Sequence, residues 1–369
     1  MEHIAIDLGA SESQICVRSA AGEILEERRI ATRPEKLRCY LAGRPNSRVI
    51  LETGAEAFWV AEIARECGHD VRVVASMLAP SLGVGRRGLK SDLRDARVLS
   101  ETSCRVDLPS VHIPRVETRR LQSRLAMREA LVRNRTQLLN VVRGYLRTIG
   151  ERAPKRTAEG LIVELREKLA YAAEQLQPVL ESIEVLNRSV KTFDEELKRL
   201  ASKDKLAKRL QTAPGVGVVT SLRYMATLDV ANRFANGAAV GSYLGLVPSD
   251  HSSGQSQRRG SITKAGSPAM RAVLVQASWA ALLSRRHRND PMMIWAREVA
   301  RRRGKKIAVV ALARKLSGIL FAMWRDGTDY DATRAAKVIP AAPRRLDCAV
   351  EIRRHAVCPS QGLLFAGGR

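Results

Sequence analysis

Acidic and aromatic residues are both scarce in this sequence of 369 residues. Lys and Arg number 63 against 38 Asp and Glu, which gives a formal net charge of +25 at pH 7. Such an excess favours phosphate backbones as partners, because each contact releases condensed counterions. The alternative is a surface whose charge only maintains solubility. With aromatic residues at 4%, base stacking on exposed rings is not expected to be the main mode of binding.

The sequence also lacks paired cysteines and a long apolar run, and no leader segment is expected. Its six cysteines are scattered and form no Cys-x-x-Cys pair, which argues against a zinc ribbon and favours reduced thiols. Asp7 interrupts the apolar start, so no signal peptide is expected. No apolar stretch reaches the roughly 18 residues of a membrane span, so no membrane partner is expected. Together with the charge, these absences predict a cytoplasmic, nucleoid-associated protein.

Residues 1 to about 108 alternate strand and helix signals. Three strands that follow one another closely predict an antiparallel meander. The order predicted is βββ, α, β, α, β, α, which is typical of ribonuclease H-like folds. The predicted strands are 4–8, 14–19, 24–30, 49–52 and 71–75, and the predicted helices are 34–41, 55–67 and one that carries Asp92 and Asp95.

Four acidic residues lie where two strands and one helix can gather them. Asp7 ends the apolar run His-Ile-Ala-Ile-Asp, and Glu52 ends the second run Val-Ile-Leu-Glu. Asp92 and Asp95 are three residues apart, on one helical face. Four carboxylates can hold a pair of Mg²⁺ ions, and two such ions clamp the attacking and leaving oxygens of a phosphoryl transfer. Because the remaining chain is basic, nucleic acid is the expected substrate.

The rest of the chain is predicted to be mostly helical. Apolar residues recur at helical spacing from about residue 115, and a second long helix, kinked at Pro178, is predicted over about 161–200, so that the two make a hairpin or an intermolecular coiled coil. Residues 211–330 are predicted to form a second compact domain with core helices at 240–246, 269–283 and 307–323. It opens on the turn 212–217, which contains Pro-Gly-Val-Gly and can present backbone N–H groups to a phosphate. The basic tail after about residue 331 shows no clear periodicity.

Several stretches together resemble one family. They are Ile-Asp-Leu-Gly at the start, Lys90-Ser-Asp-Leu-Arg-Asp-Ala-Arg97, Pro-Gly-Val-Gly, Tyr243-Leu-Gly-Leu-Val-Pro248, His251-Ser-Ser-Gly254, Ile262-Thr-Lys-Ala-Gly266 and Ala311-Leu-Ala-Arg-Lys-Leu316. This order is similar to that of the DEDD-type insertion-sequence transposases with a catalytic serine, the bridge-RNA-guided recombinases of the insertion-sequence family numbered one hundred and ten. The resemblance covers roughly residues 3–332.

The resemblance implies a transposase that excises and inserts its own element through a phosphoserine intermediate, guided by an element-encoded bridge RNA. It implies an N-terminal RuvC-like domain whose metal ligands match Asp7, Glu52, Asp92 and Asp95. Ser253 matches the nucleophile, with Ser252 as its main rival. Glu56 remains a rival for Glu52, although its expected place inside a helix argues against it. In this family the carboxylates and the serine are thought to come from different subunits, which implies a dimer or tetramer.

The expected domains are 1–110 (RuvC-like), 111–205 (helical arm), 206–332 (serine-containing) and 333–369 (basic tail). Basic residues of the first three of these domains are expected to contact phosphates, which sets affinity rather than sequence choice. They are Lys90, Arg120, Arg124, Arg128, Arg258, Arg259, Lys264, Arg302, Lys305 and Lys306. Two other functions remain open from the residues alone: a Holliday-junction-type endonuclease that uses metal-activated water, and a non-catalytic nucleic-acid-binding protein.

Overall fold

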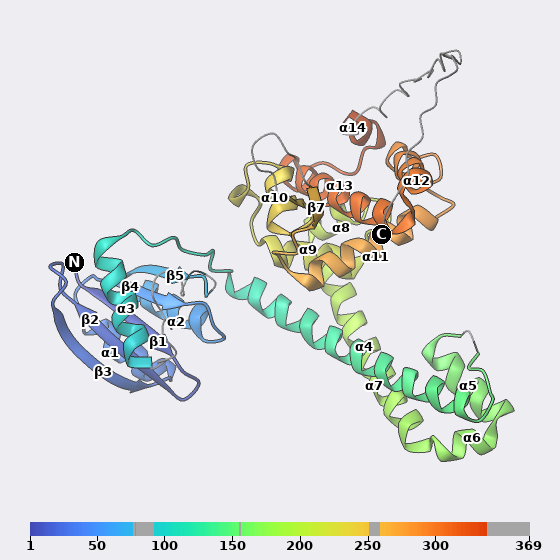
Figure 1. Cartoon of the computed structure of the whole chain (residues 1–369), viewed down its shortest axis with the longest axis horizontal. Helices are drawn as coiled ribbons and strands as arrows, with labels where there is room; N and C mark the ends of the chain where they lie inside the picture. The colour runs from blue at the N-terminus through green and yellow to red at the C-terminus, as the bar shows by residue number, and fades with distance from the viewer. Residues whose placement is uncertain (77, 79–91, 155, 251–258, 338–369) are drawn as a thin grey trace, which may run out of the picture. The chain divides into compact units, whose positions relative to one another are not determined.

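The computed structural model describes residues 1–76, 78, 92–154, 156–250 and 259–337. The chain divides into two compact units (Figure 1). Unit 1 comprises Met1–Leu200 with Leu222–Val230, and unit 2 comprises Ala201–Ser221 with Ala231–Arg369. Unit 1 holds the sheet and a long helical arm, and unit 2 is almost entirely helical. This is a mixed sheet with many helices, as the sequence predicts.

A five-stranded mixed sheet forms the start of unit 1. Its strand order is β3-β2-β1-β4-β5, with β1, β2 and β3 antiparallel and with β4 and β5 parallel to β1. The predicted meander and the order of elements are therefore confirmed. The strands are β1 (His3–Leu8), β2 (Glu12–Arg18), β3 (Ile24–Ala31), β4 (Arg48–Glu52) and β5 (Asp70–Val74).

Helices cover both faces of the sheet. On one face α1 (Pro34–Ala42) and α2 (Ala57–Glu66) pack against residues such as Ile4, Ile6 and Leu51. On the other face α3 (Asp92–Arg105) places Leu99 against Ala5, Ile50 and Val74. Because side chains alternate between the faces of a strand, residues two apart share a face. Odd-numbered β1 residues and even-numbered β4 residues thus face α3.

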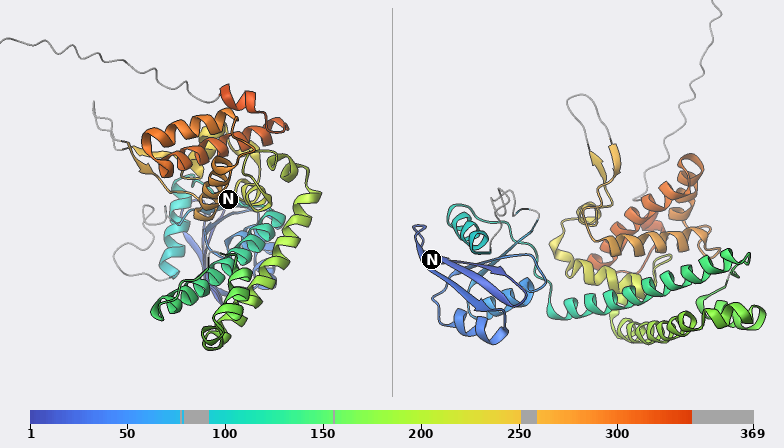
Figure 2. Two further views of the ribbon diagram at one scale, coloured as in Figure 1. Left: turned by 90° about the vertical axis from the view of Figure 1, so that its right-hand side faces the viewer. Right: turned by 60° about the horizontal axis from the view of Figure 1, so that its bottom comes forward.

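The helical arm consists of α4 (Val116–Thr148), α5 (Ala158–Lys168), α6 (Ala170–Gln175) and α7 (Gln177–Lys203) (Figure 2). The prediction of a single helix over about 161–200 is wrong, because the chain breaks twice. Leu169 leaves the helical region at φ −133° and ψ 52°, and α6 ends at Leu176. Pro178 lies in the first turn of α7, where its missing N–H costs no hydrogen bond and causes no kink.

Asp229 fixes the start of the arm within unit 1. It follows α9 (Val218–Leu228), and its side chain is almost fully buried. His112 Nε2 and Arg115 Nε lie 2.7 Å and 2.9 Å from its carboxylate oxygens, and the Thr118 hydroxyl also donates to it. The segment that leaves the sheet and the first turn of α4 therefore share one buried anion.

Unit 2 is built around α13 (Lys305–Asp326). The other elements of unit 2 include α8 (Lys205–Leu210), the short 3-10 helix η2 (Ala231–Arg233), α10 (Gly237–Tyr243), β6 (Pro248–Asp250), β7 (Arg259–Ile262), α11 (Pro268–Leu283), α12 (Pro291–Arg303) and α14 (Ala332–Lys337). Buried residues of α13 include Leu312, Leu316 and Phe321. Among the described helices α13 alone is long and apolar enough to cross a membrane, contrary to the sequence expectation, and half of its apolar window is buried inside the protein. Its packing is that of a core helix.

The cysteines of the described residues form no disulfide. Cys16 is buried, Cys39 is exposed, and Cys67 and Cys104 lie between these extremes. This agrees with the expected reduced thiols.

Candidate active site

The strand register aligns the first two predicted carboxylates. In the parallel pair β1–β4, Ala5 lies opposite Ile50 and Ile6 opposite Leu51, so the next residues along the two strands are Asp7 and Glu52. Asp7 lies two residues after Ala5 in β1, and Glu52 lies two residues after Ile50 in β4. Ala5 and Ile50 both pack on the α3 face. Both carboxylates therefore belong to the α3 face, at the carboxyl ends of adjacent strands.

Helix α3 runs antiparallel to β1 across that face. Near its end, Ser103 Oγ lies 2.8 Å from His3 Nδ1, at the start of β1. One residue beyond Leu99, Ser100 Oγ lies 3.2 Å from Cys16 Sγ, and Cys16 is the β2 partner of Ala5. Three points along the helix thus fix its direction.

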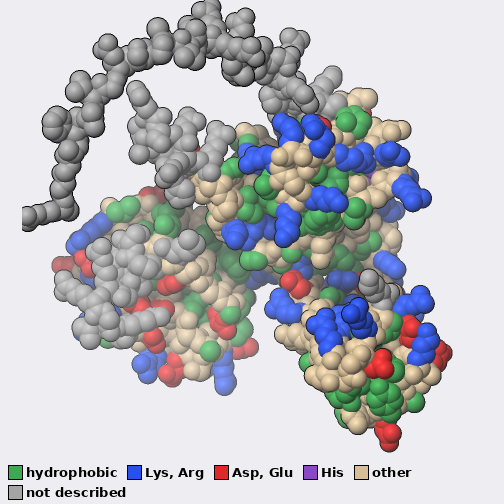
Figure 3. Space-filling model, turned by 45° about the vertical axis from the view of Figure 1, so that its right-hand side comes forward, with side chains coloured by type: hydrophobic (Ala, Val, Ile, Leu, Met, Phe, Trp, Pro, Cys, Tyr) green, Lys and Arg blue, Asp and Glu red, His purple; other side chains and the backbone are tan. Residues whose placement is uncertain are grey.

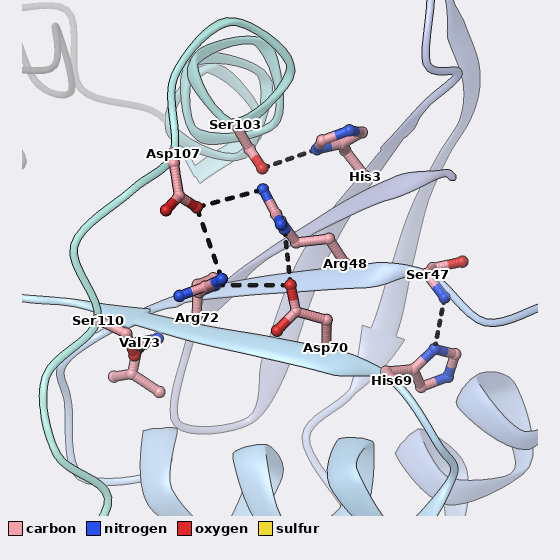
Figure 4. A network of polar contacts seen from close by, with 10 residues as sticks. All are labelled: His3, Ser47, Arg48, His69, Asp70, Arg72, Val73, Ser103, Asp107 and Ser110. Carbon is pink, nitrogen blue, oxygen red and sulfur yellow. Dashed lines mark hydrogen bonds and ion pairs between the residues drawn. The ribbon is translucent and has the colours of Figure 1, made fainter.

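The residues that follow α3 tie its end to the starts of β4 and β5. Asp107 Oδ1 lies 3.5 Å from Arg48 Nη1 and 3.5 Å from Arg72 Nη2, and Asp70 bridges the same two arginines (Figure 4). This network joins the end of α3 to the amino-terminal ends of β4 and β5. The start of α3 therefore lies at the carboxyl ends of these strands.

This direction brings Asp95 to Asp7. From Ser103 back to Asp95 is about 12 Å at 1.5 Å per helical residue. From His3 forward to Asp7 is about 13 Å at 3.3 Å per strand residue. Asp95 is 4% exposed and faces the sheet with Ala96 and Leu99, and Asp92 lies one turn earlier and is exposed. The backbone therefore gathers all four predicted carboxylates at one end of one face.

The four side chains do not form a ligand set as they stand. Among the residues that the structure describes, no group of three or more His, Cys, Asp or Glu side chains is arranged to hold a metal ion. The donor chemistry nevertheless suits Mg²⁺, which is bound in proteins by one or two carboxylates and water. Glu56, the rival of Glu52, precedes α2, which packs on the opposite face.

The predicted nucleophile lies between β6 and β7, outside the described residues. Ser253, Ser252, His251 and Arg258 fall in the segment 251–258, and Lys90 falls in 79–91. The described stem of the hairpin pairs Pro248 with Ile262 and Asp250 with Arg259. The structure therefore describes what carries the serine segment rather than the serine.

Two glycines and one arginine clamp the foot of this stem. A Cβ on Gly266 would lie 2.1 Å from Tyr243 O, and one on Gly245 would lie 2.5 Å from Ala265 N. Gly245 also has φ +65°, a conformation that favours glycine. Arg271 Nη1 donates to Gly266 O at 2.5 Å and to Leu244 O at 3.2 Å. Both glycines belong to motifs that carry the family resemblance, but the sequence alone does not predict that they clamp the stem.

The predicted phosphate-binding residues differ in their surroundings. Arg124 and Arg128 form ion pairs across the arm, with Glu196 at 2.9 Å and Asp194 at 2.6 Å. Arg302 lies 3.6 Å from Glu298. Arg120, Lys264, Lys305 and Lys306 are exposed, and Arg259 belongs to β7.

Comparison with known proteins identifies the family. A family model described as "Transposase IS116/IS110/IS902 family" matches residues 207–291, and a DEDD model of the IS110 type, described as "Transposase", matches residues 4–151. A putative transposase, y4pF/y4sB, of Sinorhizobium fredii is 32% identical over 297 residues, which cover 78% of this chain and 75% of the relative. The chain belongs to the IS110 family of transposases.

Other relatives of this IS110-type transposase are also bacterial. A probable family 20 transposase of Pseudomonas aeruginosa is 30% identical over 75% of this chain and 83% of its own length. The transposase for insertion sequence element IS1328 of Yersinia enterocolitica is 26% identical over 89% of this chain and 98% of its own. As a member of this family the chain is a DNA recombinase enzyme, and DEDD transposases are generally metal-dependent. A Holliday-junction-type endonuclease is therefore not favoured.

Proposed function

We propose that this transposase excises and inserts its element by Mg²⁺-dependent strand cleavage and rejoining through a phosphoserine intermediate. The observation that supports the proposal is the register of β1 and β4, whose last aligned pair is Ile6 with Leu51, so that Asp7 and Glu52 follow at corresponding positions on the face that α3 covers. Its sheet domain is proposed to be RNase H-like (RuvC-like), on the strand order β3-β2-β1-β4-β5.

In the proposed step, Ser253 Oγ attacks the phosphorus of a DNA phosphodiester. The Oγ–P bond forms, the bond from phosphorus to the departing deoxyribose oxygen breaks, and the proton lost by the serine is balanced by one gained at the departing oxygen. The phosphoserine keeps the bond energy, so a second DNA end can be joined without ATP. A serine hydroxyl with its ordinary pKa is a weak nucleophile and requires activation.

Asp7, Glu52, Asp92 and Asp95 are proposed to bind two Mg²⁺ ions after their side chains reorient. When bound, such ions polarise the phosphate and offset charge on the attacking and leaving oxygens. The chain's own contribution is positional: parallel strands hold Asp7 and Glu52 in register, and the buried face of α3 holds Asp95. The stem β6–β7 supports the segment that carries Ser253.

Recognition of the target is proposed to be delegated to a bridge-type guide RNA. Exposed cations such as Lys264, Lys305 and Lys306 would then bind phosphates of either strand without reading sequence. We also propose that the protein acts as a homo-oligomer in the cytoplasm, at the nucleoid.

Asp7→Asn tests the metal assignment. This variant keeps the side-chain shape but removes one charged ligand, so DNA cleavage in Mg²⁺ should be lost while DNA and RNA affinity stay unchanged. Asp70→Asn is the matched control, because Asp70 lies at the opposite end of the same sheet in the arginine network. Normal cleavage by Asp7→Asn would refute the assignment of the metal site.

A further inference from the structure

A groove in unit 2 has no role in the function proposed above. Helices α10, α12, α13 and α14 and strands β6 and β7 line it, and its volume is about 1170 Å³. Small-molecule sites usually measure roughly 300–1,000 Å³. The volume lies just above that range, so the groove has room for a segment of polymer.

Cations dominate the rim of this groove. Arg303, Lys306, Arg314 and Lys315 line it, and Lys and Arg side chains gather over the helices of unit 2 (Figure 3). The acidic residues that line it have basic partners: Asp326 pairs with Arg325 at 2.7 Å, Asp331 with Arg334 at 3.7 Å and Asp329 with Arg209 at 3.8 Å. The net field in the groove is therefore positive and favours an anionic occupant.

Two of the nearby cations lie where a helix disfavours them. Lys305 and Lys306 occupy the first turn of α13, and that turn holds no acidic residue. The helix dipole places positive partial charge at this end, so basic residues there are unfavourable. An anion bound at the groove would offset that repulsion.

The walls between the cations are apolar. Trp295 contributes its ring, over which Lys315 Nζ lies 4.8 Å from the centroid. The other apolar residues include Ile307, Val310, Ala311, Ile319 and Phe321. Grooves that bind single strands combine these features, since bases contact aromatic and apolar side chains while phosphates meet cations at the rim.

The groove begins at the serine hairpin. Gly260, Ser261 and Ile262 of β7 form part of its wall, and β7 starts directly after the segment 251–258 that contains Ser253. A strand attacked by Ser253 would therefore have this groove beside it.

We infer that the groove binds single-stranded DNA next to the phosphodiester that Ser253 attacks. This inference rests on the proposed function. The chain's own residues 338–369 fit less well, because they contain five Arg against one Asp and one Glu and would be repelled by the rim. RNA and a second copy of the chain are alternatives that the experiment separates.

The test uses full-length protein in a Ser253→Ala background, so that binding is measured without cleavage. A fluorescein-labelled oligo-dT is titrated at several salt concentrations. Lys306→Ala with Arg314→Ala should weaken binding about tenfold and lower the salt slope by about 1.4, since each single-strand phosphate contact contributes about 0.7. Arg285→Ala with Arg286→Ala removes the same charge from exposed positions that do not line the groove, and should leave the slope unchanged.

Tryptophan fluorescence reports occupancy directly. Oligo-dT should quench the protein, and Trp295→Phe should remove that quenching while Trp59→Phe in the sheet domain does not. Equal salt slopes for the groove and control variants, or quenching that survives Trp295→Phe, would overturn the inference. Quenching by oligo-rU at much lower concentration than by oligo-dT would overturn it in favour of RNA, and signals that depend only on protein concentration would favour a second copy.

The failure of the inference can be told from the failure of the proposed function. A covalent serine–DNA adduct in the parent protein, with normal oligo-dT binding by the groove variants, would reject the groove alone. Weakened binding by the groove variants without any adduct would reject the phosphoserine chemistry and keep the groove.

Discussion

Asp229 is a single residue on which the start of the arm depends. Burial acts to raise the pKa of this carboxyl, but hydrogen bonds from Thr118, His112 and Arg115 outweigh burial and lower the pKa to about 2. Its backbone has φ 64°, a conformation that Asn also tolerates. Replacement by Asn therefore removes the charge without adding backbone strain.

We expect Asp229→Asn to lower the free energy of unfolding by about 2 kcal/mol at pH 7. The folded pKa lies below the unfolded value of 3.8, so this stability is complete above about pH 4 and is lost as the pH falls towards 2. Urea denaturation of both proteins between pH 2 and pH 7 measures the difference. Asp329→Asn, at a carboxylate with 71% exposure, is the control. A difference that does not shrink in acid would contradict this account.

At the residue scale, the sequence predicts the places of Asp7 and Glu52 correctly, because each ends an apolar run that forms a strand. Their role as metal ligands stays a prediction. Asp229 could not be identified, because its partners are more than a hundred positions away in sequence. No local pattern marks a residue whose role is to join distant segments.

At the scale of elements, the β6–β7 stem depends on backbone contact rather than on side-chain packing. Tyr243, Gly245 and Gly266 bring two chain segments so close that a Cβ has no space. Short strands with few contacts gain little stability alone. The glycines and Arg271 therefore determine whether the serine segment has a fixed support.

Gly266→Ala should lower the free energy of unfolding by about 2 kcal/mol or more, because the new methyl group overlaps Tyr243 O. It should also reduce DNA cleavage more than DNA binding. Gly144→Ala is the matched control, since a Cβ there meets nothing within 4 Å. Thermal unfolding and cleavage assays of the two variants compare them, and equal behaviour would exclude a clamping role for Gly266.

The arm presents a different case, because Arg124 and Arg128 have acidic partners. Arg128 and Asp194 side chains are 22% and 34% exposed and join α4 to α7 at 2.6 Å. Exposed or half-exposed pairs contribute about 0.2–1 kcal/mol. The pair therefore adds little to the stability of the arm. The pairing of Arg128 with Asp194 favours a structural role for Arg128 over phosphate binding.

Exchange of the two charges separates these roles. The double variant Arg128→Asp with Asp194→Arg restores the pair and preserves net charge, so nucleic-acid affinity should equal that of the parent. Arg128→Asp alone should lower it by breaking the pair and reversing a charge. A double variant as weak as the single one would instead place Arg128 in contact with phosphate, as the sequence predicts.

At the scale of the whole molecule, the periodicity of apolar residues predicts most of the architecture. The βββαβαβα order and the helical second half follow from apolar periodicity, and the structure confirms both. The break at Leu169 was missed because neither Gly nor Pro marks it. At the second position the sequence predicts a kink at Pro178, whereas the helix ends at Leu176 and a new one begins with Pro178 in its first turn. Helix α12 was not predicted, because it lies between longer apolar segments. The apolar length of α13 was underestimated, because its flanking charges conceal its apolar centre.

The sequence also predicts that the carboxylates and the serine lie in different parts of the chain. The carboxylates belong to unit 1 and the segment 251–258 to unit 2. Apolar periodicity could not predict the groove, because the groove is formed where four helices and two strands meet. Surfaces made by several elements leave no local pattern.

The central claim is serine-mediated strand transfer, and a denaturing gel tests it most directly. The protein is mixed with Mg²⁺, DNA that spans the joined element ends, and RNA transcribed from the element's non-coding flank. We expect a covalent protein–DNA adduct that is lost with Ser253→Ala, retained with Ser252→Ala and lost when Mg²⁺ is removed. Cleavage without any adduct, unchanged in Ser253→Ala, would contradict the account and indicate a nuclease that uses water.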